Sequence, residues 1–279
     1  MDISKFKEPI VSVTWLQENI ENPNLVILDA SIPKAGQTED SLTDEMIEGA
    51  RFIDLKTRWA KSGDVFPNTM LEPIPFQEAA RQLGINNDST IIAYDEHGIY
   101  SSARAWYMFK AMGHQNIAVL DGGLPAWSAE NLPTQAKNSY EGEPGNFTST
   151  FSASYFKNYP EVLEQLDDPS KLVLDARAND RFLGLTAEPR KGLRSGHIPN
   201  SENLHFGDLE NKGKMKSKEE LEALFSAVVK NDQELIFSCG SGITACVLAL
   251  GAEMTGRKNI SVYDGSWTEW GSLPNLPVD

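Results

Sequence analysis

The chain has 279 residues, of which 40% are hydrophobic and 23% charged, so it is long enough for two domains with cores of their own. A formal net charge of −15 argues against general binding to nucleic acid or to an anionic membrane surface, since both are themselves negative. Two cysteines make no disulfide framework and indicate a reducing compartment. We find neither a secretory signal nor a stretch near the ~20 apolar residues of a membrane span, and expect a cytoplasmic protein without a membrane or nucleic-acid partner.

The two halves of the chain resemble each other. One pair of matching segments is displaced by 144 residues and the next by 143, and a shared displacement indicates two copies of one domain. We place an N-terminal domain at 1–130, a polar linker at 131–152 and a C-terminal domain at 153–279. The matching segments are 25–30 with 172–177, 49–55 with 200–206, 91–95 with 235–239, and 116–127 with 259–270.

Short apolar strands alternate with helical stretches in each copy. The pattern predicts helices over 76–84 and 101–113 in the first copy, and over 218–230 and 244–256 in the second. Such alternation is typical of α/β domains, each with a mainly parallel central sheet flanked by helices. Ligand sites in such sheets form beyond the carboxyl ends of the strands.

The run LIFSCGSGITAC (235–246) contains the strongest functional signal. It predicts a buried strand, a tight Gly-Ser-Gly turn and a helix from Ile243 onward, so Cys239 stands where a strand ends and a helix begins. Backbone N–H groups of the turn and the helix N-terminus favour a thiolate there, which makes the cysteine a candidate nucleophile. Asp95 takes this position in the first copy, so we expect only the second domain to be catalytic.

The residues after the cysteine fit a cradle for its sulfur. Gly240 and Gly242 allow the backbone to curve closely around it. Ser241 and Thr244 could direct hydroxyl groups into the cradle, although both residue types also cap helices. Cys246 lies two helical turns further on among apolar neighbours, where we expect it to pack in the core.

The loop that begins at Cys239 is compatible with other interpretations. Cys239 could be an inert buried cysteine. A cysteine phosphatase would need an arginine where Ala245 stands, which excludes that class. The pattern G-x-G-x-x-A at 240–245, followed by a strand that ends near Asp264, is compatible with dinucleotide binding, but too little chain remains for the usual sheet. No histidine pattern supports a metal site.

A basic stretch at 177–194 follows the predicted strand of the second copy that matches 25–30 in the first. It combines five cations with two acids and is expected to face the same edge as Cys239, where guanidinium groups could hold a small anion. Solvated surface charges are the alternative. His197 could act as a base, but we favour a role in fixing its loop. The cations are Arg177, Arg181, Arg190, Lys191 and Arg194, and the acids are Asp180 and Glu188.

Together these motifs resemble the tandem rhodanese-like sulfurtransferases, in particular the 3-mercaptopyruvate branch. The resemblance covers nearly the whole chain. Gly240 and Ser241 differ from the Cys-Arg-Lys-Gly loop of relatives that use the thiosulfate dianion, and a neutral loop favours a monocarboxylate. The motifs are CGSGITAC (239–246), YDGSWTEWG (263–271), GHIP (196–199), DAR…RF (175–182), EPR (188–190) and YDEHGIYSSARAWYMF (94–109).

The resemblance implies a two-step transfer through a persulfide on Cys239, with no metal and no organic cofactor. Arg181 and Arg190 would hold the substrate carboxylate, and Ser241 would assist proton transfer. The loop from Gly240 to Thr244, with Gly242 and Ile243, would bind the sulfur through its N–H groups. The implied partners are a small sulfur donor and an acceptor such as thioredoxin, another thiol or cyanide. The alternatives are a thiosulfate sulfurtransferase and a persulfide carrier for a partner protein.

One departure from the family pattern concerns proton transfer. Family members generally carry a histidine in a run that reads EMIEGA (45–50) here, so Met46 occupies the expected histidine position. A thioether cannot move protons, which places a histidine-dependent triad with Ser241 in doubt. The acid of such a triad is not identified from the sequence.

Overall fold

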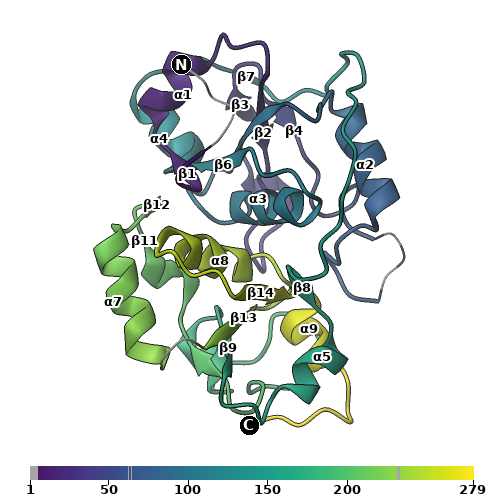
Figure 1. Cartoon of the computed structure of the whole chain (residues 1–279), viewed down its shortest axis with the longest axis vertical. Helices are drawn as coiled ribbons and strands as arrows, with labels where there is room; N and C mark the ends of the chain where they lie inside the picture. The colour runs from purple at the N-terminus through teal and green to yellow at the C-terminus, as the bar shows by residue number, and fades with distance from the viewer. Residues whose placement is uncertain (1–5, 62, 64, 231–232) are drawn as a thin grey trace. The chain divides into compact units, whose positions relative to one another are not determined.

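The computed structural model describes residues 6–61, 63, 65–230 and 233–279 (Figure 1). The start of the chain, on which the secretion argument partly depends, lies outside these residues. The chain divides into two compact units, and neither is contiguous in sequence. Unit 1 comprises Met1–Ser62, Met70–Ser152 and Lys212–Met215, whereas unit 2 comprises Gly63–Thr69, Ala153–Asn211 and Lys216–Asp279. Each unit therefore includes a short segment from the other half of the chain.

Unit 1 is built on a five-stranded sheet in the order β1-β6-β5-β2-β4, in which all neighbours are parallel. Its elements are β1 (Ile10–Val11), α1 (Val13–Asn19), β2 (Leu25–Asp29), the 3-10 helix η1 (Glu39–Ser41), β3 (Glu45–Ile47), β4 (Arg51–Phe52), α2 (Pro73–Gln82), β5 (Thr90–Tyr94), α3 (Ser102–Ala111), β6 (Ile117–Leu120), α4 (Gly123–Ala129), β7 (Thr134–Ala136) and β12 (Lys214–Met215).

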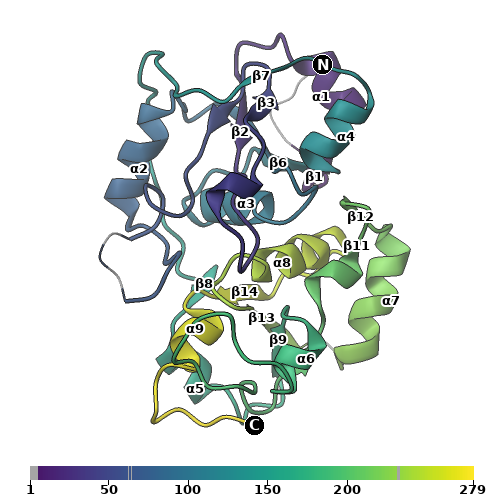
Figure 2. The same ribbon diagram turned by 180° about the vertical axis from the view of Figure 1, so that it is seen from behind.

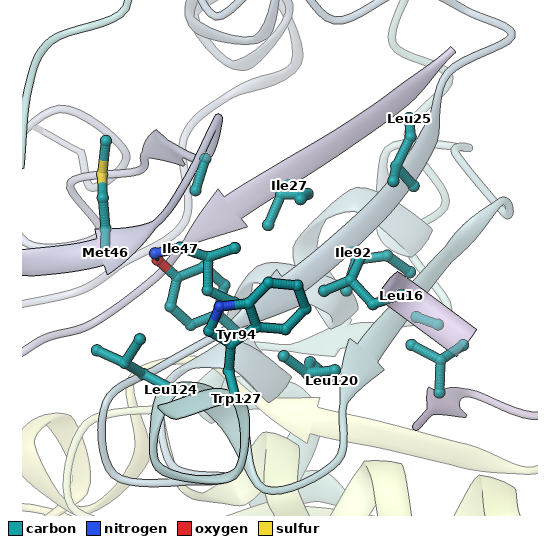
Figure 3. Close-up of a cluster of buried hydrophobic side chains, with 13 residues drawn as sticks. Leu16, Leu25, Ile27, Met46, Ile47, Ile92, Tyr94, Leu120, Leu124 and Trp127 are labelled. Carbon is teal, nitrogen blue, oxygen red and sulfur yellow. The ribbon is translucent and has the colours of Figure 1, made fainter. Parts of the chain in front are cut away.

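Both faces of this sheet are covered, which explains why β5 is apolar along its whole length. Ile92 and Tyr94 point into a cluster with Leu16 of α1 and Trp127 of α4 (Figure 3). The other face receives α2 and α3, whose phenylalanines pack edge to face. Residues 131–152, predicted as a linker, lie in unit 1, where β7 pairs antiparallel with β3.

Unit 2 repeats this plan with the order β10-β9-β13-β14-β8, again parallel throughout. Its elements are β8 (Phe156–Lys157), α5 (Tyr159–Glu164), β9 (Lys171–Asp175), α6 (Asn179–Phe182), β10 (Glu202–Asn203), the 3-10 helix η2 (Phe206–Leu209), β11 (Glu210–Asn211), α7 (Lys218–Val228), β13 (Glu234–Ser238), α8 (Ala245–Met254), β14 (Ile260–Tyr263) and α9 (Ser266–Trp270).

The helices of unit 2 also cover both faces of its sheet. Figures 1 and 2 show α8 on one side of β13 and β14, with α5 and α9 on the other. Trp267 and Trp270 of α9 pack with Ile236 of β13 in one core cluster. A capping box between Ser217 and Glu220 begins α7, which packs on α8.

The two sheets therefore have the same strand order, and the predicted fold of two α/β domains with parallel sheets is confirmed. β5 and β13 are the central strands of their sheets, and Asp95 and Cys239 follow them directly. The equivalent position in each unit is thus the carboxyl end of its middle strand, where the sequence placed the site. Among the described residues, no helix is long and apolar enough to cross a membrane.

Candidate active site

Cys239 is buried, with 1% of its surface exposed, and its backbone is held by the start of α9. Its N–H donates to Oγ of Ser266 at 3.1 Å, and its carbonyl accepts from the N–H of Trp267 at 2.9 Å. Ser266 in turn donates to the carbonyl of Tyr263 at 2.8 Å. The segment 263–271, which carried part of the family resemblance, thus fixes the position of the cysteine rather than contributing a reactive group.

The loop after Cys239 turns sharply at Gly242, whose φ of +77° lies in the left-handed region that favours glycine. Helix α8 begins at Ala245, two residues later than predicted, because the turn occupies Ile243 and Thr244. Thr244 takes the N-cap position but its side chain makes no capping hydrogen bond. Cys246 is buried, and its thiol donates to the carbonyl of Gly242 at 3.4 Å, in agreement with a core position.

Gly240 lies close to two arginine side chains, and its backbone conformation does not itself call for glycine. A Cβ at this position would lie 3.3 Å from Nη2 of Arg181 and 3.9 Å from Nη1 of Arg190. The structure therefore brings the two predicted substrate arginines to the loop that begins at Cys239. A larger residue at position 240 would compete with these guanidinium groups for the same space.

Arg190 points its guanidinium at two hydroxyl groups. Nη2 donates to Oγ of Ser241 at 3.4 Å, and Nη1 donates to Oγ1 of Thr268 at 3.3 Å. Thr268 itself donates to the carbonyl of Gly240, so the loop, α9 and the arginine form one hydrogen-bonded group. Thr268 was not singled out from the sequence, although it lies in a quoted motif.

Arg181 is held differently, because it is paired with a buried carboxylate. Its Nη2 lies 2.6 Å from Oε2 of Glu188 and its Nε 3.2 Å from Oε1. The same carboxylate accepts from Nη1 of Arg177 at 2.8 Å, and Arg177 also pairs with Asp175 at 2.7 Å. Burial by itself lowers the pKa of Arg177, but the two carboxylates outweigh it and raise the pKa, so this guanidinium stays charged.

The other basic residues of the stretch do not reach the loop. Arg194 donates to the carbonyls of Trp270, Gly271, Leu273 and Leu276, and so fixes the chain that follows α9. Lys191 is exposed. His197 stacks on Phe182 at 3.9 Å between ring centroids and bonds its carbonyl through Nδ1 at 2.9 Å, so it fixes its loop as we favoured.

Asn68 contacts the loop, and the sequence reasoning missed it. Its Nδ2 donates to Oγ of Ser241 at 2.9 Å. Asn68 belongs to Gly63–Thr69, the segment of the N-terminal half that is part of unit 2. A signal in the sequence was not used: Pro67 and Asn68 form a pair that is typical of turns. In the structure Asn68 adopts a φ of +65°, which asparagine tolerates well.

Met46 is not a partner of Ser241. It is fully buried in the hydrophobic cluster of unit 1, which Figure 3 shows together with Ile47, Tyr94 and Trp127. The expectation that position 46 offers no proton-transfer group beside Ser241 agrees with this buried, apolar place. A methionine fits the apolar surroundings of β3, whereas the side chain that reaches Ser241 comes from the segment around Asn68.

The equivalent loop of unit 1 contains an acid whose carboxylate accepts hydrogen bonds from residues of the same loop. Asp95 is fully buried and accepts from the N–H groups of Tyr100, Ser101 and Ser102 at 2.8–2.9 Å. It also accepts from the Ser102 hydroxyl at 2.6 Å and from the N–H of His97 at 2.9 Å. This strand-to-helix turn therefore binds an anion, and in unit 1 that anion is a side chain of the chain itself.

Comparisons with known proteins agree with this architecture. A model of the rhodanese-like domain matches residues 12–130 and again 158–273. The chain is 38% identical to a 3-mercaptopyruvate sulfurtransferase of Mus musculus, over 94% of this chain and 91% of the relative. It is also 38% identical to a thiosulfate sulfurtransferase of Mus musculus, with the same two coverages.

Among solved structures, a 3-mercaptopyruvate sulfotransferase from Escherichia coli matches with a TM-score of 0.84 and 32% identity. The match covers 94% of this chain and 99% of that one, so both units and the order of their elements are shared. The relatives thus include proteins named for either of two sulfur donors, and similarity alone does not choose between these donors.

Proposed function

Because the chain belongs to the rhodanese-like family, we propose that it transfers sulfur from 3-mercaptopyruvate to a thiol acceptor through a persulfide on Cys239. The observation that carries this proposal is the arrangement of Arg190. Its guanidinium contacts Ser241 and Thr268, the two hydroxyl groups bonded to the loop that begins at Cys239. A cation so placed can hold a small carboxylate beside the thiol.

The first half-reaction moves one sulfur atom and one proton. The Cys239 thiolate attacks the donor's sulfur, an S–S bond forms, and the C–S bond breaks with its electron pair going to the carbon as an enolate. The proton of the donor's thiol then moves to that carbon. Cys239 becomes a persulfide anion and pyruvate leaves, so atoms and charge balance without any further reagent.

The charges around the site support a monoanionic donor. Among the described residues, Arg177 and Arg181 form ion pairs with Asp175 and Glu188, whereas Arg190 contacts the hydroxyl groups of Ser241 and Thr268 and has no carboxylate partner. Mercaptopyruvate carries one carboxylate, whereas thiosulfate is a dianion. Desolvating a second negative charge that has no matching cation is costly, so this balance favours mercaptopyruvate.

The two arginines have unequal roles in this proposal. The Nε–Nη2 edge of Arg181 is used on Glu188, so that edge does not form a bidentate fork with a ligand. Arg190 is then the main carboxylate ligand, and Arg181 adds its charge nearby. The loop from Gly240 to Thr244, with Gly242 and Ile243, supplies backbone N–H groups for the thiolate and the persulfide.

The second half-reaction returns Cys239 to its starting form. An acceptor thiolate attacks the outer sulfur of the persulfide, the S–S bond breaks, and the Cys239 thiolate leaves. We propose a protein thiol such as thioredoxin as the acceptor, with small thiols or cyanide as substitutes. Two successive half-reactions predict ping-pong kinetics. Cys239 is free, and a catalytic thiol that must stay reduced suits a reducing compartment such as the cytoplasm.

The test is to mix the purified protein with mercaptopyruvate alone and measure the mass of the peptide that contains Cys239. We expect a gain of one sulfur atom, which a later addition of thiol removes. The values of kcat/KM with mercaptopyruvate and with thiosulfate should then be compared. A protein that gains no sulfur from either donor contradicts the proposal, and a preference for thiosulfate replaces the donor. Persulfide formation without steady turnover of small thiols indicates a carrier.

A further inference from the structure

The hydroxyl of Ser241 accepts two hydrogen bonds. Nδ2 of Asn68 lies 2.9 Å from its oxygen, and Nη2 of Arg190 lies 3.4 Å from it. An amide NH₂ and a guanidinium can only donate. A hydroxyl oxygen has two lone pairs and one hydrogen, so two donors occupy both lone pairs and leave the hydrogen to be donated elsewhere.

The orientation of the Asn68 amide is set by a second acceptor. The same Nδ2 lies 3.5 Å from the backbone carbonyl oxygen of Ser241, which can only accept. Turning the amide around would bring two oxygens together at this point. Its NH₂ group therefore faces Ser241, and its oxygen, which could have taken the hydroxyl proton, faces away.

The backbone at this position does not by itself require asparagine. Asn68 has a φ of +65°, and asparagine tolerates the left-handed region well. Lys212, 144 residues later in the repeat, has a φ of +54° in the segment Lys212–Met215. Gly213 of that segment lies against Gly98 of the Asp95 loop in unit 1. A lysine thus takes the same backbone conformation at the equivalent place, so the choice of asparagine in unit 2 needs another reason.

We propose that Asn68 is a positioning residue which, together with Arg190, holds the hydroxyl of Ser241 as a donor toward the substrate. This inference rests on the proposed function and specifies how Ser241 acts in it. When the C–S bond breaks, negative charge develops on the keto oxygen of the donor, and the hydroxyl hydrogen bonds to that oxygen. Ser241 does not pass its proton to a base, because the groups that face its oxygen, the NH₂ of Asn68 and the guanidinium of Arg190, can only donate.

A hydrogen bond that strengthens as charge develops acts on the rate more than on binding. Losing the orientation of Ser241 should therefore lower the maximal rate constant of persulfide formation and leave the half-saturating mercaptopyruvate concentration unchanged. A loss of local structure would instead change both quantities. This split between rate and binding distinguishes a positioning role from a structural one.

The experiment measures single-turnover persulfide formation on the full chain. Asn68→Gly keeps the left-handed backbone and removes the amide, and we expect the maximal rate constant to fall by roughly tenfold. Asn68→Asp keeps similar backbone tolerance but presents only acceptors, so it turns the hydroxyl away from the substrate and should lower the rate constant further. Lys212→Gly, the same change in the equivalent segment of unit 1, is the matched control and should react like the wild type.

The Ser241→Ala background separates the two explanations of any loss. If Asn68 acts through the hydroxyl, Asn68→Gly should cause no further loss in that background. An equal loss in both backgrounds would overturn the inference, as would a wild-type rate for Asn68→Gly or Asn68→Asp. Failure of the proposed function is recognised separately, because the wild type itself would then gain no sulfur from mercaptopyruvate, and both proposals would fall.

Discussion

The loops after β5 and β13 follow the same backbone course but carry different side chains at their first position. Each follows a central strand, turns at a left-handed glycine (Gly98 and Gly242, 144 residues apart) and leads into a buried helix. In unit 1 the turn is filled by the carboxylate of Asp95, which accepts hydrogen bonds from four N–H groups and one hydroxyl. In unit 2 a thiol takes its place. If the proposed function holds, this one side chain decides whether the turn is filled by a carboxylate or can bind a persulfide.

The largest effect should come from replacing the thiol of Cys239, the side chain that distinguishes the two loops. Cys239→Ser leaves a group of similar size that is a far weaker nucleophile, so we expect turnover to fall by roughly 10³-fold or more and persulfide formation to vanish. Steady-state rates and the mass of the peptide measure this. Retained turnover would show that Cys239 is not the nucleophile.

Asp95→Ala tests whether the acid of unit 1 is structural. The change leaves several buried N–H groups without an acceptor, and we expect the free energy of unfolding to fall by roughly 3 kcal/mol or more. Chemical denaturation measures the loss. Asp95→Asn retains one carbonyl acceptor and should lose less. An unchanged stability for Asp95→Ala would contradict the anion-binding description of this turn.

The two arginines at the Cys239 loop should differ in importance. Arg190→Ala removes the guanidinium that contacts Ser241 and Thr268, and should cost roughly 2–4 kcal/mol of transition-state stabilisation in kcat/KM with mercaptopyruvate. Arg181→Ala should cost about 1 kcal/mol, because its Nε–Nη2 edge is used on Glu188. A larger loss from Arg181→Ala would reverse the proposed roles.

The smallest effect concerns the acids that end β2 and β9. Asp175 pairs with buried Arg177, whereas Asp29 has Ser31 at the corresponding place and Lys137 at 3.7 Å. Burial raises the pKa of Asp29 above its ordinary 3.8, against the opposing effects of Ser31 and Lys137. Asp29 then contributes its full stabilisation to the folded state below pH 3.8, and this stabilisation is lost as the pH rises through the raised pKa.

Asp29→Asn removes that titration. The melting temperature of the wild type, relative to the variant, should fall as pH increases from about 4 to about 7. Thermal unfolding at several pH values measures the difference. A relative rise over this range would mean that Lys137 and Ser31 outweigh the burial of the carboxylate.

Local patterns predicted the fold and the place of Cys239 at the end of a central strand well. Apolar strands such as 235–238 and the glycine turn after Cys239 are fixed by neighbours in sequence, and the repeat located Asp95 as the counterpart. The exact start of α8 was missed because the turn continues through Thr244. The start of α2 was missed by three residues, although both helices were otherwise recognised.

Side-chain partners were less predictable, because they depend on residues far apart in the chain. A basic stretch shows five cations, but only packing decides that Arg194 bonds backbone carbonyls while Arg190 faces Ser241. Asn68 and Ser241 are 173 residues apart, and they meet because a segment of one half belongs to the unit of the other. No periodicity or motif reports such an exchange, which is why Asn68 was missed.

The exchanged segments also constrain how the protein can be made. Unit 1 takes in Lys212–Met215, so it cannot be completed on the ribosome until most of the second half has been synthesised. A fragment that starts at Ala153 would carry Cys239, Arg181 and Arg190 but would lack Asn68. A gene that encodes either half alone would therefore specify an incomplete unit. Once the two halves had exchanged these segments, the duplication could not be reversed simply by separating the copies.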